Sequence, residues 1–177
     1  MILGLDISTS ITGATILDKT GEMLYNRSWD TRNKKKYSDL YKKADFIKTH
    51  LAYIKEHFSI NQIYVEQSLQ SFRSGFSSAH TLSTLSRFNG IISWISYELF
   101  DLEPQMLAAI SARKLVGVVK KKGENAKEKS LEFVVDTVPE FMVEYTKFGN
   151  PRPGTYDRSD SYIIAKAGLI KCKNNKF

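Results

Sequence analysis

The sequence predicts a mixed α/β sheet with helices packed on its faces, and three patterns support this. Three short strand-like segments joined by tight turns open the chain. Apolar residues at three- and four-residue steps then mark long helices over residues 37–58 and 80–100. Further short apolar strands lie between and after these helices. Because strands alternate with helices after the opening segment, we expect the helices to cover both faces of one sheet.

The opening segment is predicted to be an antiparallel meander. Residues 1–7 (MILGLDI) form a short apolar strand, and residues 11–17 (ITGATIL) form a second. The turn 18–21 (DKTG) leads into a third strand over residues 22–30. A basic loop, TRNKKK, then precedes the first long helix.

The rest of the chain continues the alternation of strands and helices. A buried strand, QIYVE, ends at Glu66, and a polar and aromatic loop, SLQSFRSGFSS, leads to the second long helix. The later elements are expected to be a strand over 105–110, a short helix capped by Ser111, a helix from the capping box Asn125–Glu128 to Val138, a Gly/Pro loop over 147–154, and a last helix with Thr155 or Asp157 as N-cap.

Composition limits the classes of function. The 177 residues suit one domain (1–177), and 26 Lys and Arg against 19 Asp and Glu give a net charge of +7. A basic surface suggests a polyanionic partner, either nucleic acid or an anionic membrane. The single cysteine, Cys172, fits a reducing compartment, and three scattered histidines disfavour zinc, so a metal would need oxygen ligands. No apolar run is long enough to span a membrane.

Four carboxylates stand out by position. Asp6 interrupts an apolar strand, Glu66 ends another, and Asp157 and Asp160 share a face of the last helix. Each also has an ordinary interpretation: a strand end satisfied by the following serines, a fraying strand end, or a helix cap. If the first and fourth strands are neighbours beneath the last helix, all four converge, and cations must offset their repulsion. Two Mg²⁺ ions would do so and would assist phosphodiester hydrolysis.

Four segments occur in order: LGLDISTSITG, IYVEQ, SARKLVGVVKKKGENAKEK and YDRSDSYIIAKAG. Together they resemble the RuvC family of Holliday-junction resolvases over nearly the whole chain. The resemblance implies a ribonuclease H-like fold with a mixed five-stranded sheet. It also implies that Asp6, Glu66, Asp157 and Asp160 are catalytic and bind two Mg²⁺ ions, which Mn²⁺ can replace. Finally, it implies a homodimer that places two active sites on opposite strands of a four-way junction.

The chain departs from the family pattern in three places, one of which is the basic segment before the last motif, where the chain is one residue shorter than usual. Ile7 and Ser8 stand where the family has Pro-Gly, which changes the turn but not the carboxylate. Leu69 stands where an aromatic residue often reaches the junction centre. Phe72 and Phe76 are the nearest aromatics; either they stack on an unpaired base or they cover the core.

Basic residues supply the other candidate DNA contacts. Arg73 follows Glu66 in the loop, where it is predicted to contact the backbone near the cut. A lysine group lies before and at a helix N-terminus, which suits phosphate binding, although a plain solvated run is the alternative. Its members are Lys120, Lys121, Lys122, Lys127 and Lys129.

The helix 80–100 is the predicted dimer interface. Small residues recur along it at three- and four-residue steps, and its other faces are apolar. The alternative is that this stripe packs on the chain's own sheet. Its members are Ala79, Ser83, Ser86, Gly90 and Ser93.

The sequence therefore predicts a metal-dependent endonuclease that resolves Holliday junctions and other branched DNA by paired phosphodiester hydrolysis. One alternative is a branched-DNA-binding protein without catalysis. The other is an actin- or sugar-kinase-like phosphotransferase, because LGLDISTSITG partly matches the first phosphate motif of that class. The expected location is the cytoplasm of a bacterial or phage-infected cell; the family also occurs in mitochondria and viruses.

Overall fold

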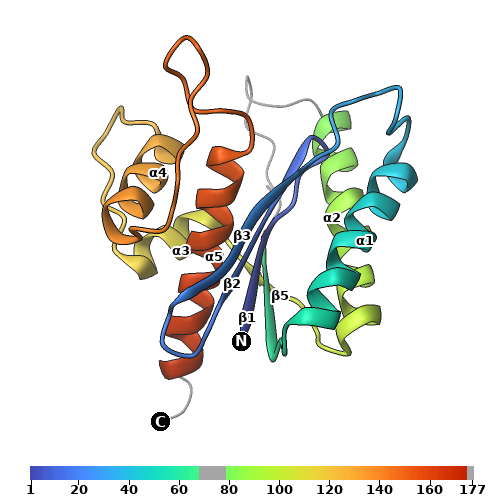
Figure 1. Cartoon of the computed structure of the whole chain (residues 1–177), viewed down its shortest axis with the longest axis horizontal. Helices are drawn as coiled ribbons and strands as arrows, with labels where there is room; N and C mark the ends of the chain where they lie inside the picture. Colours follow the sequence, from blue (N-terminus) through green and yellow to red (C-terminus); the bar gives the residue numbers. More distant parts are fainter. Residues whose placement is uncertain (68–78, 175–177) are drawn as a thin grey trace.

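A five-stranded sheet forms the centre of the protein, as the computed structural model in Figure 1 shows. The model describes residues 1–67 and 79–174, so Phe72, Arg73 and Phe76 lie outside the described residues. The strand order is β3-β2-β1-β4-β5. The strands are β1 (Ile2–Asp6), β2 (Ile11–Leu17), β3 (Met23–Asp30), β4 (Gln62–Glu66) and β5 (Gln105–Leu107).

The strand pairing confirms the predicted meander and the central position of β1. β1 pairs with β2 and β2 with β3 in antiparallel fashion, whereas β1–β4 and β4–β5 are parallel. In the parallel β1–β4 pair, Leu5 lies opposite Val65. Asp6 and Glu66, the next residue of each strand, therefore reach the same edge of the sheet.

Helices cover both faces of this sheet (Figure 1). Two of them, α1 (Leu40–His57) and α2 (Ala79–Phe100), pack with the side chains of Leu3 and Leu5 in one core. The opposite core contains Ile2 from β1 and the other three helices. These are α3 (Ala109–Val116), α4 (Ala126–Thr137) and α5 (Thr155–Asn174).

Helix α5 packs closely on the sheet at two glycines that face it. A Cβ at Gly4 would overlap the backbone of Ala165, and one at Gly13 would overlap the carbonyl oxygen of Asp157. These two positions let the helix axis approach strands β1 and β2, and the first turns of α5 consequently lie over the end of β1.

A buried polar network fixes the position of α5 relative to strands β2 and β3. The Thr15 hydroxyl on β2 lies 2.8 Å from that of Ser161 on α5. Asn26 on β3 donates to Thr15 Oγ1 at 2.7 Å and to the Arg158 carbonyl at 3.1 Å. Buried polar atoms need such partners, so this network disfavours sliding of the helix along the sheet.

Several boundaries differ from the sequence prediction. The strand predicted over 105–110 ends at Leu107, and α3 begins at Ala109, so Ser111 lies inside the helix and is not its cap. The first helix begins at Leu40, where the Asp39 side chain accepts a hydrogen bond from the Lys42 amide, and not at residue 37. The first shift falls in an apolar run that fits a strand or a helix equally well, and the second reflects the N-cap at Asp39.

Asn125 is confirmed as the N-cap of α4, and Glu128, its partner in the predicted capping box, binds the side-chain amide of Asn125. Asn125 Oδ1 accepts from the Lys127 amide at 2.9 Å, and Asn125 Nδ2 donates to Glu128 Oε1 at 3.3 Å. Helix α4 thus begins one residue before Lys127. In the parts of the chain that the model describes, no helix combines the length and apolar character needed to cross a membrane.

Candidate metal centre

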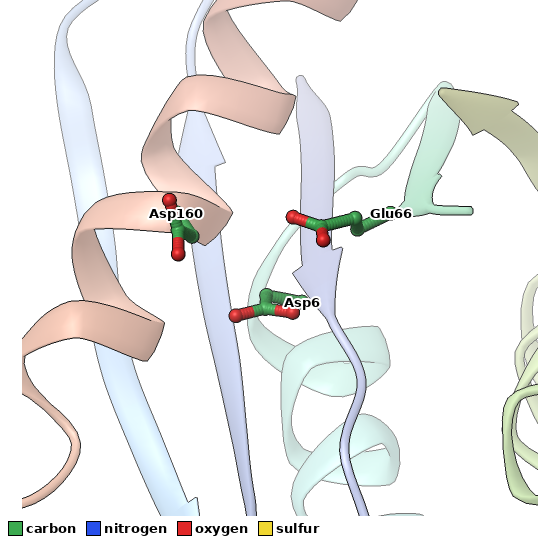
Figure 2. Close-up of side chains that lie close together, drawn as sticks. All are labelled: Asp6, Glu66 and Asp160. Atoms are coloured by element: carbon green, nitrogen blue, oxygen red, sulfur yellow. The ribbon is translucent and has the colours of Figure 1, made fainter. Parts of the chain in front are cut away.

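Three of the four predicted carboxylates gather at one edge of the sheet. Asp6 is the last residue of β1, Glu66 is the last of β4, and Asp160 lies in the second turn of α5. One oxygen from each lies within 4.8 Å of the others, and Figure 2 shows the three side chains facing a common space. We call these three residues the carboxylate cluster.

The carboxylate cluster is largely shielded from water. Asp6 is 9% exposed and Asp160 is 2% exposed. The Ser8 hydroxyl accepts from the amides of Ser10 and Ile11, at 3.2 and 3.0 Å, and donates to the Ile11 carbonyl. The Ser8 hydroxyl therefore closes its own turn and does not neutralise Asp6. A buried carboxylate that no hydroxyl or amide stabilises favours a bound cation or a bound proton.

The pKa values of Asp6 and Glu66 reflect burial and the repulsion between the carboxylates of the cluster. Burial raises the pKa of Asp6 well above its usual range, and the charges of Glu66 and Asp160 add to the shift. Burial and then Asp160 raise the pKa of Glu66 to about 7. Since both shifts favour the uncharged acid, a cation bound among these groups would displace protons.

Asp157 lies beside the carboxylate cluster but outside the group of three. Burial raises the pKa of the Asp157 carboxyl. Its negative charge is close enough to contribute to the raised pKa values of Asp6 and Glu66. Its role as a fourth ligand remains a prediction.

Two cations already lie against Asp160. Arg113 on α3 places Nη2 3.2 Å from Asp160 Oδ1 and donates from Nε to Ser130 Oγ at 2.9 Å. Lys127 Nζ lies 3.9 Å from Asp160 Oδ2. Burial by itself would lower the pKa of Lys127, but the charges of the surrounding carboxylates together raise it.

Arg113 is a site residue that sequence reasoning did not single out. It lies in the basic segment 111–129, where its neighbour Lys114 is an equally plausible cation. Its side chain is only 16% exposed, which distinguishes it from the exposed Lys114. No local pattern shows which of the two faces the carboxylates.

The predicted lysine group divides in the structure. Lys127 faces the carboxylate cluster, whereas Lys129 pairs with Glu132 at 2.7 Å and with Glu124 at 3.5 Å. Lys120, Lys121 and Lys122 are exposed between α3 and α4. DNA contact by these lysines stays a prediction.

The donor set fits a hard divalent cation. All three members of the cluster offer carboxylate oxygens, the ligands that Mg²⁺ and Mn²⁺ prefer over nitrogen or sulfur. Their burial and mutual repulsion provide the electrostatic reason for a cation there.

The small-residue stripe of α2 faces outward. Ala79, Ser83, Ser86 and Gly90 are exposed, and a Cβ at Gly90 would meet nothing within 4 Å among the described residues. Farther along the same helix, Trp94 is 62% exposed and Tyr97 is 43% exposed. The alternative that this stripe packs on its own sheet is therefore wrong for its first four members.

Comparisons with known proteins identify the fold. No protein-family model and no curated protein sequence matches the chain. Its structure is similar to that of T. thermophilus RuvC in complex with a Holliday junction substrate, with a TM-score of 0.66, 14% identity, and coverage of 98% of this chain and 94% of that one. It is also similar to the Thermus thermophilus RuvC structure, with a TM-score of 0.64, 13% identity, and coverage of 98% of this chain and 96% of that one. The predicted RuvC-like, ribonuclease H-like fold is thus confirmed.

Proposed function

We propose that this protein is a metal-dependent endonuclease that resolves Holliday junctions and other branched DNA. The observation that carries the proposal is the carboxylate cluster, which sits at the edge of the sheet on a RuvC-like fold. A basic chain with a net charge of +7 supports a polyanionic substrate.

The residues assigned to the metals are Asp6, Glu66 and Asp160, with Asp157 as the fourth. Together they would hold two Mg²⁺ ions, or Mn²⁺ ions in their place. When bound, such ions stabilise negative charge on phosphodiester oxygens and lower the pKa of a coordinated water. Arg113 orients Asp160 by binding Oδ1, while Oδ2 lies 3.9 Å from Lys127 Nζ.

Basic residues near the cluster would position the DNA backbone. Lys127 stands at the start of α4, beside the acids, so it is placed to contact a phosphate next to the cut. The exposed run Lys120–Lys122 would extend this contact along the strand. Phosphate contacts of this kind fix register without reading sequence.

Paired cutting of a four-way junction favours a homodimer, and the outer face of α2 is the proposed interface. Gly90 is open to close approach, and Trp94 and Tyr97 offer exposed aromatic surface beside it. Gly90→Trp should give a folded monomer that nicks junctions without pairing the cuts, whereas Lys42→Trp on exposed α1 should remain dimeric. Sedimentation of the wild-type protein as a monomer, with and without junction DNA, would reject this interface.

A cleavage panel tests the function itself. Wild-type protein with Mg²⁺ is incubated with a four-way junction, a flap and a linear duplex, and ATP turnover is measured in parallel. We expect junction cutting that Asp160→Asn abolishes without loss of binding, while the exposed control Asp136→Asn cuts normally. Binding without cutting would favour the non-catalytic alternative, and ATP turnover would favour the phosphotransferase.

A further inference from the structure

A second charged site lies on the other side of α5. A cleft of about 350 Å³ is bounded by β3, by the residue Arg32 that follows it, and by the segment that enters α5. Four arginines line this cleft: Arg27, Arg32, Arg152 and Arg158. Glu144 is the only acid that the described residues place in its wall. We call this site the arginine cleft.

The four arginines come from segments far apart in sequence, and the fold brings them together. Arg158 is fixed most firmly: its Nε donates to Asn26 Oδ1 at 2.7 Å, its Nη2 donates to the Met142 carbonyl at 3.1 Å, and its guanidinium lies 4.7 Å from the centre of the Phe141 ring. Gly154, at φ +93°, lets the chain turn into α5 against Ser28. The wall of the cleft is therefore a built structure and not a chance overlap of flexible side chains.

The arginines repel one another, as the acids do. Burial, and then the like charge of Arg27, lower the pKa of Arg158. Arg32 pairs with Asp30 at 2.6 Å and Arg152 pairs with Glu144 at 3.5 Å, but all four of these side chains are about half exposed or more. Exposed pairs of this kind are weak and can be exchanged for a stronger anion.

The position of the cleft relates it to the carboxylate cluster. Arg158 and Asp160 are two residues apart on α5, so their side chains leave the helix about 200° apart. Asp157 lies between the two sites, close enough that its charge contributes to the raised pKa of Arg32. A strand crossing the start of α5 over the carboxylates would next meet the arginines.

We infer that the arginine cleft binds backbone phosphates of the DNA strand that passes over the carboxylate cluster, on the side away from Lys120–Lys122. This inference rests on the proposed function, because the phosphates in the cleft belong to the DNA that the protein is proposed to cut. The cleft of about 350 Å³ has room for more than a single small group, since one water occupies about 30 Å³ in the liquid. Guanidinium groups bind phosphate oxygens in a planar, two-pronged geometry, which suits phosphodiesters.

The test is metal-free DNA binding by a paired variant, Arg27→Ala/Arg152→Ala. Both side chains are exposed, so the variant should fold normally. The matched control, Lys19→Ala/Lys173→Ala, removes two exposed positive charges at the far end of the sheet and of α5. Fluorescence anisotropy with a labelled junction, repeated over a range of salt, gives the affinity and its salt slope.

We expect the arginine variant to bind roughly tenfold more weakly. Its salt slope should fall by about one to two units, since each phosphate that is no longer neutralised lowers the slope by about 0.9. Arg27→Glu should weaken binding further, whereas the lysine control should match wild type. A methylphosphonate at a phosphate that the arginine cleft holds should weaken wild-type binding and should have no added effect in the variant. The inference is overturned if the arginine variant and its control bind alike at every salt concentration.

This result is separable from the proposed function. If wild-type protein cuts no junction but the arginine variant still loses salt-dependent binding, the cleft stands and the nuclease proposal fails. If wild-type protein cuts junctions and the arginine variant binds and cuts like it, the nuclease proposal stands and the cleft is rejected.

Discussion

The carboxylate cluster and the arginine cleft flank the first turns of α5, and each gathers groups of like charge. They differ in their access to water. Asp6 and Asp160 are at most 9% exposed, whereas Arg27, Arg32 and Arg152 are exposed at the surface. Buried charges keep their repulsion because little water screens it, while exposed charges are hydrated and screened by salt.

Because of this difference, we expect the two sites to have different roles. The carboxylates of the cluster are held at fixed positions close to one another, so a bound cation would stabilise the fold and, in the proposed nuclease, would create a strong field at the reacting phosphate. The arginine cleft supplies diffuse attraction to a polyanion, which mainly affects affinity and its salt dependence. Substitutions at the first site should therefore affect chemistry and stability, and substitutions at the second should affect binding.

The largest effect is expected from Asp6→Asn. Loss of one central ligand should lower Mg²⁺-dependent cleavage by about 10³-fold or more, because the ions that carry charge stabilisation are no longer held. Metal-free junction binding should stay unchanged or tighten, since a negative charge beside the backbone is removed. Single-turnover cleavage and anisotropy measure the two quantities.

The matched change in the other site is Arg27→Ala, which should weaken binding while the cleavage rate at saturating DNA is kept. If Asp6→Asn lowered affinity as strongly as rate, or if Arg27→Ala lowered the saturated rate, the division of work between the sites would fail.

A smaller effect is expected from the exposed lysine run. Replacing Lys120, Lys121 and Lys122 with Ala should weaken binding and lower the salt slope by about one unit for each phosphate that the run neutralises. Combining this change with Arg27→Ala/Arg152→Ala should give additive losses of binding free energy, because the two basic regions lie on different sides of α5. A salt titration identical to wild type would assign the lysine run to solvated surface.

The carboxylate cluster was predictable from sequence because its members break local rules. Asp6 interrupts an apolar strand, Glu66 ends another, and Asp160 starts an apolar helix face. A charge in an apolar context needs a compensating partner, so the three positions are informative together, although each has an ordinary interpretation alone. The parallel pairing of β1 and β4 then brings two of them to one edge.

The arginine cleft was not predictable for the opposite reason. Arg27 lies on an exposed position of the edge strand, and Arg152 lies in a Gly/Pro loop, where arginine is ordinary. Their proximity depends on how the entry to α5 packs against β3, which no local spacing encodes. The shifted start of α3 has a simpler cause, because residues 105–110 form an apolar run that fits either a strand or a helix.

A third prediction concerns Arg113, the positively charged side chain that contacts Asp160 of the carboxylate cluster. Arg113→Met removes the 3.2 Å ion pair to Asp160 but keeps much of the side-chain volume. We expect a loss of roughly 2 kcal/mol of metal-free stability, seen as a lower melting temperature. Saturating Mg²⁺ should recover most of this loss, because a bound cation replaces the missing charge. Lys114→Met, an exposed neighbour on α3, should melt like wild type, and equal losses with and without Mg²⁺ would mean that Arg113 acts only through packing.

The last prediction is a dependence of metal-free stability on pH. The pKa of Glu66 is about 7 in the folded state against an ordinary value of 4.5, so the folded protein holds this proton more tightly than the unfolded chain does. The stability that this proton contributes is complete below about pH 4.5 and is lost as the pH rises through about 7. For one proton the slope is at most about 1.4 kcal/mol per pH unit, and partial solvent access to Glu66 makes it less.

Thermal unfolding in a chelator should therefore show a falling melting temperature between about pH 5 and pH 8. Mg²⁺ should remove this fall, because the cation takes the place of the proton and binds better as the carboxylates ionise. The stabilisation by Mg²⁺ should consequently grow with pH. Glu66→Gln should make the metal-free profile shallower but not flat, because burial also raises the pKa of Asp6. Glu103→Gln, at an exposed site, should leave the profile unchanged. A metal-free melting temperature that rises over this range in wild type, but not in Glu66→Gln, would show that Glu66 is already ionised and paired in the folded protein.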